Sequence, residues 1–151
     1  MRIINIIKIT YNYSNIYIKM QYVIPNQLTY GQIGEEFCKC YYSKTINGIN
    51  TTIDLFHPGA LCTVEGEELV GGYNLLLKLA NLGISRFEYN NVSGITQPVS
   101  NSEIVITVNG TLRGIGYWGQ VYQWVKFNEV FILENIGGSR FIVKNYMIRA
   151  V

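Results

Sequence analysis

The chain is poor in charged residues and in the residues that acid–base and metal chemistry use most. Only 15% of its 151 residues are Asp, Glu, Lys or Arg, and the formal net charge is +2. It has a single aspartate, Asp54, and a single histidine, His57. So small a charge is not typical of nucleic-acid-binding proteins or of proteins held on acidic membranes, so we expect neither partner.

Cysteine is scarce as well, with three residues in the whole chain. Cys38 and Cys40 lie two apart in an expected helix, where they point to different faces, and Cys62 lies in an expected strand. No cysteine pair has the spacing of metal ligands together with histidines that could complete a metal site. We therefore expect three buried thiols, no metal or other cofactor, and a cytoplasmic or nuclear rather than a secreted protein.

Long uninterrupted apolar runs are missing too, although 48% of the residues are hydrophobic. Residues 1–19 are rich in Ile and Tyr, but Asn5, Lys8 and Asn12 interrupt them, which argues against a signal peptide or a membrane span. Two interpretations stay open: an edge strand or strand pair, and an extension outside the domain. We place the extension at residues 1–28 and one folded domain at residues 29–151.

Helical spacing of apolar side chains is confined to the first half of that domain. Glycine-containing turns there separate two short strands from each other and from the last helix. The expected elements are a helix over 30–46, a short helix that begins at Thr51 and ends at His57-Pro58-Gly59, strands 61–64 and 68–70 around a turn at Glu65-Gly66, and a helix over 73–82.

The second half has the pattern of an antiparallel sheet, with strands expected over 86–98, 103–114, 121–135 and 139–151 and a hairpin turn at Gly137-Gly138. Both faces of these strands are apolar; strict alternation places Val143 and Met147 together on one of them. Three helices can cover one face, and a second subunit is the simplest cover for the other. The pattern alone therefore predicts a dimer.

Four segments resemble the nuclear transport factor 2 family, in the family's order and spacing: YGQIGEEFCKCYY at 30–42, TVEGEELVGG at 63–72, FNEVFIL at 127–133 and NYMIR at 145–149. The resemblance covers about residues 29–151. It implies an α+β, NTF2-like cone, in which three N-terminal helices pack on a strongly curved, mainly antiparallel sheet. It also implies dimers that pair through the open face of the sheet. The interface residues expected from it are Met147, Glu129, Asn128, Phe131 and Val143.

The resemblance implies a non-catalytic binding protein of nucleocytoplasmic transport. Family members bind phenylalanine-glycine repeats of nucleoporins near an aromatic residue at the start of the first helix, which is Tyr30 here. The family's mRNA-export branch pairs with a larger NTF2-like subunit, so a homodimer and a heterodimer both stay open.

Family members that carry the GTPase Ran in its GDP form use acids in the turn that Glu65 occupies and in a later hairpin. In this chain Val64 replaces the tryptophan before that acid, and residues 113–120 contain no carboxylate. A basic surface on Ran would lose its partners, so we do not expect Ran-GDP binding. The same hairpin carries Tyr117 and Trp118, which we expect to bind a partner, because Trp and Tyr dominate interface hot spots.

The alternative function is a small-ligand binder or an isomerase- or dehydratase-type enzyme that uses the cavity of the same superfold. Its acid–base groups would be drawn from Asp54, His57, Tyr41, Tyr42 and Glu129. Asp54 is equally explained by helix capping, and His57 by its place at a helix end.

Overall fold

The structure, a computed structural model, describes residues 5–12, 15–21, 28–137 and 140–151. Within these ranges the chain forms two α-helices, one 3-10 helix and eight strands. They are β1 (Asn5–Asn12), β2 (Asn15–Gln21), α1 (Leu28–Asn47), η1 (Ile49–Leu55), β3 (Phe56–Val64), β4 (Glu67–Val70), α2 (Gly72–Asn81), β5 (Ile84–Pro98), β6 (Glu103–Gly116), β7 (Val125–Gly137) and β8 (Arg140–Ala150).

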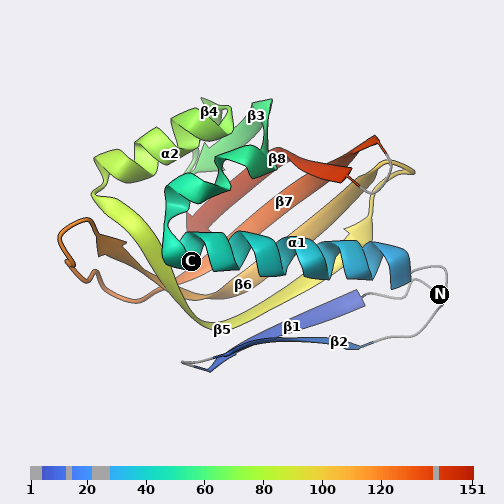
Figure 1. Cartoon of the computed structure of the whole chain (residues 1–151), viewed down its shortest axis with the longest axis horizontal. Helices are drawn as coiled ribbons and strands as arrows, with labels where there is room; N and C mark the ends of the chain where they lie inside the picture. The colour runs from blue at the N-terminus through green and yellow to red at the C-terminus, as the bar shows by residue number, and fades with distance from the viewer. Residues whose placement is uncertain (1–4, 13–14, 22–27, 138–139) are drawn as a thin grey trace.

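The eight described strands make one curved sheet in the order β2-β1-β5-β6-β7-β8-β3-β4. Among their pairings only β3 with β8 is parallel. Helix α1 runs across one face of the sheet, and η1 and α2 lie over the β3 end of that same face (Figure 1). The expected α+β cone is confirmed, with one correction: the second of its three helical segments is a 3-10 helix.

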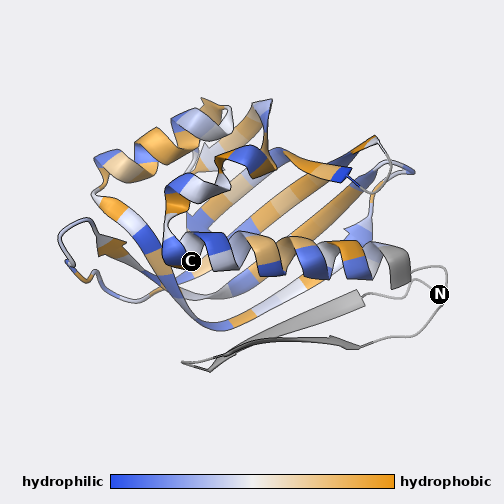
Figure 2. Cartoon of the chain, in the orientation of Figure 1, coloured by the Kyte–Doolittle hydropathy of each residue, from blue (hydrophilic) through white to orange (hydrophobic). Residues whose placement is uncertain are grey.

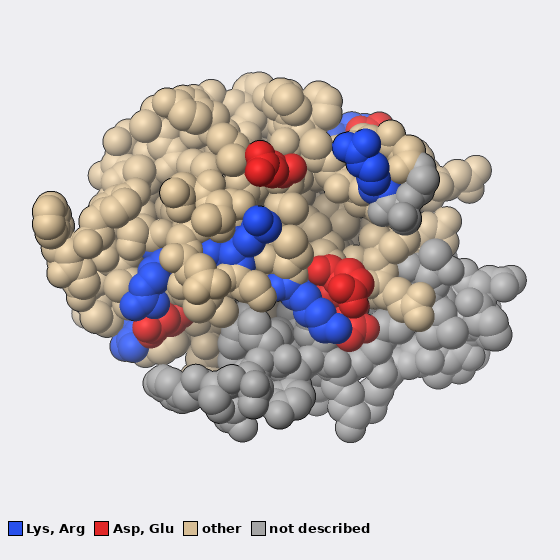
Figure 3. Space-filling view, in the orientation of Figure 1, with Lys and Arg blue, Asp and Glu red and all other residues tan. Residues whose placement is uncertain are grey.

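The face of the sheet that α1 covers, here called the inner face, holds the core. In β6 and β7, every second residue is buried against the helices, and the apolar stripes of these strands are visible behind α1 in Figure 2. The largest fully buried side chains from the two strands are Ile104, Ile106, Val108, Phe127, Glu129, Phe131 and Leu133. Charged side chains are few and scattered on the helix-covered side of the molecule, which follows from the composition (Figure 3).

Strand β8 departs from strict alternation at Lys144. Leu133 pairs with Val143, but Ile132 pairs with Asn145, so Lys144 is an extra residue in a β-bulge. Side chains after the bulge therefore change faces: Val143 is buried on the inner face, whereas Met147 is exposed on the opposite, open face. Their expected placement on a common face is wrong, because alternation holds only where the pairing is unbroken.

Other boundaries differ from the sequence-based expectation. The strand expected from residue 121 begins at Val125, because Val121 makes only an isolated bridge to Ile115. Cys38 and Cys62 are buried as expected, but Cys40 is exposed. The expected turn at Gly137-Gly138 lies partly outside the described residues.

Residues of the N-terminal segment join the sheet as the β1–β2 hairpin. Asn5 to Lys8 of β1 pair with Thr96 to Ser93 of β5. Without this hairpin, β5 would be an edge strand in that part of the sheet. No described helix is long and apolar enough to span a bilayer.

Helix α1 packs closely on β5 at Gly34. A Cβ atom at this position would lie 2.4 Å from Oγ1 of the buried Thr96, whose β-branched side chain has little room to move. Gly34→Ala should lower the free energy of unfolding by about 1–3 kcal/mol, despite the better helix propensity of alanine. Urea unfolding of Gly34→Ala, alone and combined with Thr96→Ala, tests this contact. The second change should recover most of the loss, and an equal loss in both backgrounds would contradict the prediction.

Candidate functional site

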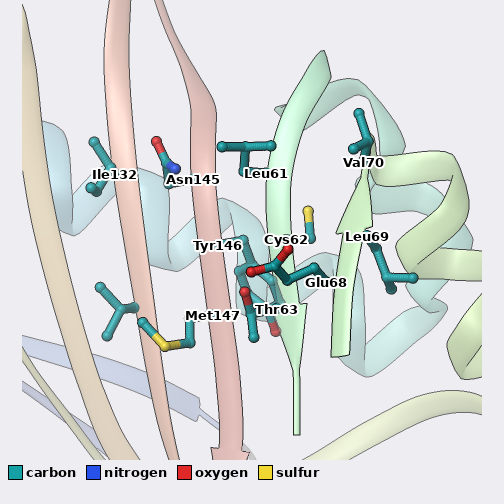
Figure 4. A pocket seen from close by; sticks show the side chains of 11 residues that line it. Leu61, Cys62, Thr63, Glu68, Leu69, Val70, Ile132, Asn145, Tyr146 and Met147 are labelled. Carbon is teal, nitrogen blue, oxygen red and sulfur yellow. The ribbon is translucent and has the colours of Figure 1, made fainter. Parts of the chain in front are cut away.

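The open face of the sheet, away from α1, carries a groove of about 500 Å³. Strands β3, β4, β7 and β8 form it, and Figure 4 shows the side chains that line it. Its lining residues are Leu61, Cys62, Thr63, Glu68, Leu69, Val70, Val130, Ile132, Asn145, Tyr146 and Met147.

Strand pairing arranges these side chains in two neighbouring rows across the sheet. One row runs Val70–Leu61–Asn145–Ile132, and the next runs Glu68–Thr63–Met147–Val130. Most of the groove surface is therefore aliphatic, with Glu68, Asn145 and Thr63 as its polar groups. Leu61, Val70 and Met147 are among the large apolar side chains that the chain leaves exposed. A contiguous exposed patch of this kind marks an interaction surface.

The expected interface residues are divided between the two faces of the sheet. Met147 and Asn128 lie on the open face, where Asn128 Nδ2 donates to Asn109 Oδ1 at 2.6 Å. Phe131, Val143 and Glu129 are buried within the chain on the inner face. They are removed from the expected interface, because a side chain enclosed by its own core presents no surface to a partner.

Glu129 instead lies at the centre of a buried hydrogen-bond network. Its side chain is 2% exposed and accepts hydrogen bonds from three tyrosine hydroxyls. Tyr42 donates to Oε1 at 2.5 Å, while Tyr41 at 3.4 Å and Tyr146 both donate to Oε2. The network joins α1, which supplies Tyr41 and Tyr42, to the central strands β7 and β8.

Burial governs the titration of this network. Desolvation raises the pKa of Glu129 to about 7, and the hydrogen bonds from Tyr146, Tyr42 and Tyr41 offset part of that rise. Burial, together with the nearby Glu129 carboxylate, raises the pKa of all three tyrosines, so they remain protonated donors. A buried carboxyl group that titrates near neutral pH is found in many active sites, and also in structural networks.

Aromatic rings occupy the interior around this carboxyl group. The ring centroids of Tyr41 and Phe131 are 4.8 Å apart, those of Tyr42 and Tyr89 are 4.9 Å apart, and Tyr146 also packs on Phe131 at 5.2 Å. These contacts hold each hydroxyl in place around a carboxyl group that is 2% exposed.

The other acid–base candidates are not near this interior. Asp54 and His57 are both exposed, whereas Tyr41 and Glu129 are buried. His57 Nδ1 accepts a hydrogen bond from the Gly59 backbone N–H at 2.9 Å, which is a local contact within β3. Within the described part of the chain, no three His, Cys, Asp or Glu side chains are grouped so that they could hold a metal ion.

The expected partner-binding residues lie at separate places on the surface. Tyr30, in the first turn of α1, is half-buried and packs against the core. Glu65 is exposed at the β3–β4 turn with a φ of 49°, and its carboxylate accepts the Ala150 backbone N–H. Tyr117 and Trp118 are exposed at the tip of the β6–β7 hairpin.

The sequence analysis missed part of the groove and part of the hydrogen-bond network around Glu129. Leu61, Val70 and Asn145 in the groove were not predicted as functional, although Leu61 alternates with buried Cys62 in a short strand. Strict alternation would place Tyr146 on the face opposite Val143, but the bulge at Lys144 returns it to the inner face beside Glu129. No local sequence signal identifies that bulge.

Comparison with known proteins identifies the fold. No protein-family model matches the sequence, and no curated protein matches it. Solved structures do: nuclear transport factor 2 from Cryptosporidium parvum is similar with a TM-score of 0.65 and 24% identity, covering 87% of this chain and 100% of that one. Mtr2 is also similar, with a TM-score of 0.60 and 14% identity. The match covers 82% of this chain and 99% of the Mtr2 chain. The chain therefore has the NTF2-like fold.

This fold also includes enzymes. A candidate scytalone dehydratase from Novosphingobium aromaticivorans is similar with a TM-score of 0.64 and 12% identity, covering 83% of this chain and 86% of that one. Identities this low establish the fold alone. Function has to be argued from the groove, the interior and the hairpin of this chain.

The raised pKa of Glu129 predicts how stability depends on pH. The folded-state pKa is about 7 and the ordinary value is 4.5, so between these values the folded chain binds a proton that the unfolded chain has released. Stability should therefore fall as pH rises from 4.5 to 7, by roughly 3 kcal/mol from this group, and stay level above 7. Glu129→Gln should flatten this slope, as measured by urea unfolding at a series of pH values. A slope that is unchanged in Glu129→Gln would contradict the prediction.

Proposed function

We propose that this chain is a non-catalytic, dimeric binding protein, and that its open sheet face is the pairing surface. The observation that carries the proposal is the groove with exposed Leu61, Val70 and Met147 on a face that α1 and α2 do not cover. Burying such side chains against a second subunit is favourable by roughly 25 cal/mol per Å² of apolar surface. A self-complementary face pairs readily about a two-fold axis.

The cellular role we propose is nucleocytoplasmic transport, in the cytoplasm and at the nuclear envelope. It is supported by the four sequence segments that resemble nuclear transport factor 2 and by the structural similarity to that protein from Cryptosporidium parvum. Nucleoporin phenylalanine-glycine repeats are the proposed ligand near Tyr30, whose ring is half-buried at the start of α1. A second NTF2-like subunit on the open face is the competing partner.

Ran-GDP is not part of the proposal. The β6–β7 hairpin offers no carboxylate, and Arg113 at its base would repel a basic partner. Glu65 is also partly engaged, since its carboxylate accepts the Ala150 N–H.

Catalysis is the weaker alternative. Glu129 has the raised pKa that a general acid or base needs, but it is enclosed by aromatic rings, and Asp54 and His57 lie on the surface. We therefore assign Glu129 a structural role that ties α1 to the sheet.

Solution mass tests the pairing surface. The wild-type chain of 17.2 kDa should scatter light as a dimer, and Met147→Glu should shift it to a monomer, because the new carboxylate would be buried at the interface. Leu77→Glu on α2 is the matched control, since Leu77 and Met147 are both 45% exposed. The control should remain a dimer.

Other outcomes of the light-scattering experiment would contradict the proposed pairing surface. Dimers of Met147→Glu would place the pairing surface elsewhere. A wild-type chain that is monomeric and poorly soluble would favour a different NTF2-like subunit as the natural cover of the open face. Binding of phenylalanine-glycine peptides, measured on the wild type and on Tyr30→Ala, tests the transport role separately.

A further inference from the structure

The β6–β7 hairpin carries a second exposed apolar surface, remote from the groove rows in strand register. We call it the aromatic tip and define it by six exposed residues: Leu82, Tyr117, Trp118, Val121, Tyr122 and Trp124. Leu82 belongs to it because its carbonyl oxygen accepts the Tyr122 hydroxyl at 3.4 Å. Trp118 is 90% exposed, so almost none of its large apolar surface is used by the fold.

The tip is held in a defined shape by hydrogen bonds. The Gly116 N–H donates to the Gln120 carbonyl at 2.8 Å, and the Gly119 N–H donates to the Gly116 carbonyl at 3.1 Å. The Trp118 N–H donates to the Gln120 side-chain oxygen at 3.0 Å. Trp118 is therefore presented by an ordered turn, and a partner would not have to order the loop on binding.

The charged residues next to the tip are three cations and one carboxylate. Residues 104–128 contain Arg113 and Lys126 and no Asp or Glu. The nearest carboxylate, Glu88 on β5, already pairs with Arg113 at 2.6 Å and with Arg86 at 3.4 Å. Exposed aromatic side chains thus project from a base of two arginines and a lysine, and the tip can be desolvated without burying a carboxylate.

We propose that the aromatic tip docks on an anionic lipid bilayer, with Trp118 and Tyr117 at the headgroup level. Tryptophan and tyrosine are the side chains that favour this interface, because each combines an apolar ring with a polar group. Arg86, Arg113 and Lys126 behind them would face the lipid phosphates. In Figure 1 the hairpin projects at the left, beyond the body of the sheet, so a flat surface can reach it.

Single-stranded nucleic acid fits this surface less well. Stacking of bases needs open aromatic faces. Here the Arg113 guanidinium already lies 4.7 Å from the centre of the Trp124 ring and covers one face of it. The net charge of +2, which argued against a membrane partner, describes the whole chain and not this end of it.

The two tryptophans of the chain are both in the tip, so its own fluorescence reports on the site. Purified protein is mixed with phosphatidylcholine vesicles, with or without phosphatidylserine. We expect the emission to shift to shorter wavelength and the protein to sediment with the phosphatidylserine-containing vesicles. Tyr117→Ser/Trp118→Ser should lose sedimentation, whereas Tyr73→Ser should keep it. Tyr73 on α2 is a fair control, because it is 66% exposed and Tyr117 is 62% exposed.

Light scattering on the tip variant keeps the two proposals separate, since its mass should equal that of the wild type. The bilayer proposal is overturned if wild-type protein stays in the supernatant with both vesicles, or if the tip variant sediments as well as the wild type. Equal binding to vesicles with and without phosphatidylserine would overturn the anionic requirement. An emission shift with phenylalanine-glycine peptides but with neither vesicle would assign the tip to a protein ligand instead.

Discussion

The constraint on which the rest of this structure depends is a long antiparallel sheet with apolar side chains on both faces. Each apolar face of a sheet must be covered by another layer of structure to be removed from water. Helices α1 and α2 with η1 provide the first, and the chain has no second layer to spare among its described elements. The groove on the open face is the consequence, because the apolar side chains of that face remain exposed.

The interior shows how the fold tolerates a carboxyl group in an aromatic core. An isolated carboxylate would be costly there, but three tyrosine hydroxyls supply donors from both α1 and β8. The same rings that bring the hydroxyls close also shield the carboxyl group from solvent. The hydrogen bonds at Glu129 connect the helix to the sheet.

Most of the architecture could be predicted from the sequence, because α1, α2 and the long strands have clear periodicity and glycine-marked ends. Which side chains lie on the open face could be predicted only in part. Resemblance placed Met147 on the open face, where it lies. It also placed Phe131 and Glu129 there, but both belong to the core. Periodicity shows which side chains share a face of the sheet, but it does not show which face the helices cover. Exposure of Tyr122 and Trp124 could not be predicted either, because they alternate as core residues do and yet precede the start of β7.

The bulge at Lys144 determines which side chains of β8 lie on the inner face and which lie on the open face. Upstream of it, Val143 packs into the core; downstream, Tyr146 turns toward Glu129 and Met147 toward the groove. Strict alternation through residues 143–147 would exchange the two sets, placing a thioether beside the buried carboxyl group and a phenol on the open face. Deletion of one residue at the bulge would instead make the pairing regular and leave both sets on their present faces. The core network and the outer groove thus both depend on one irregularity in the pairing of β8, although neither surface contains the Lys144 side chain.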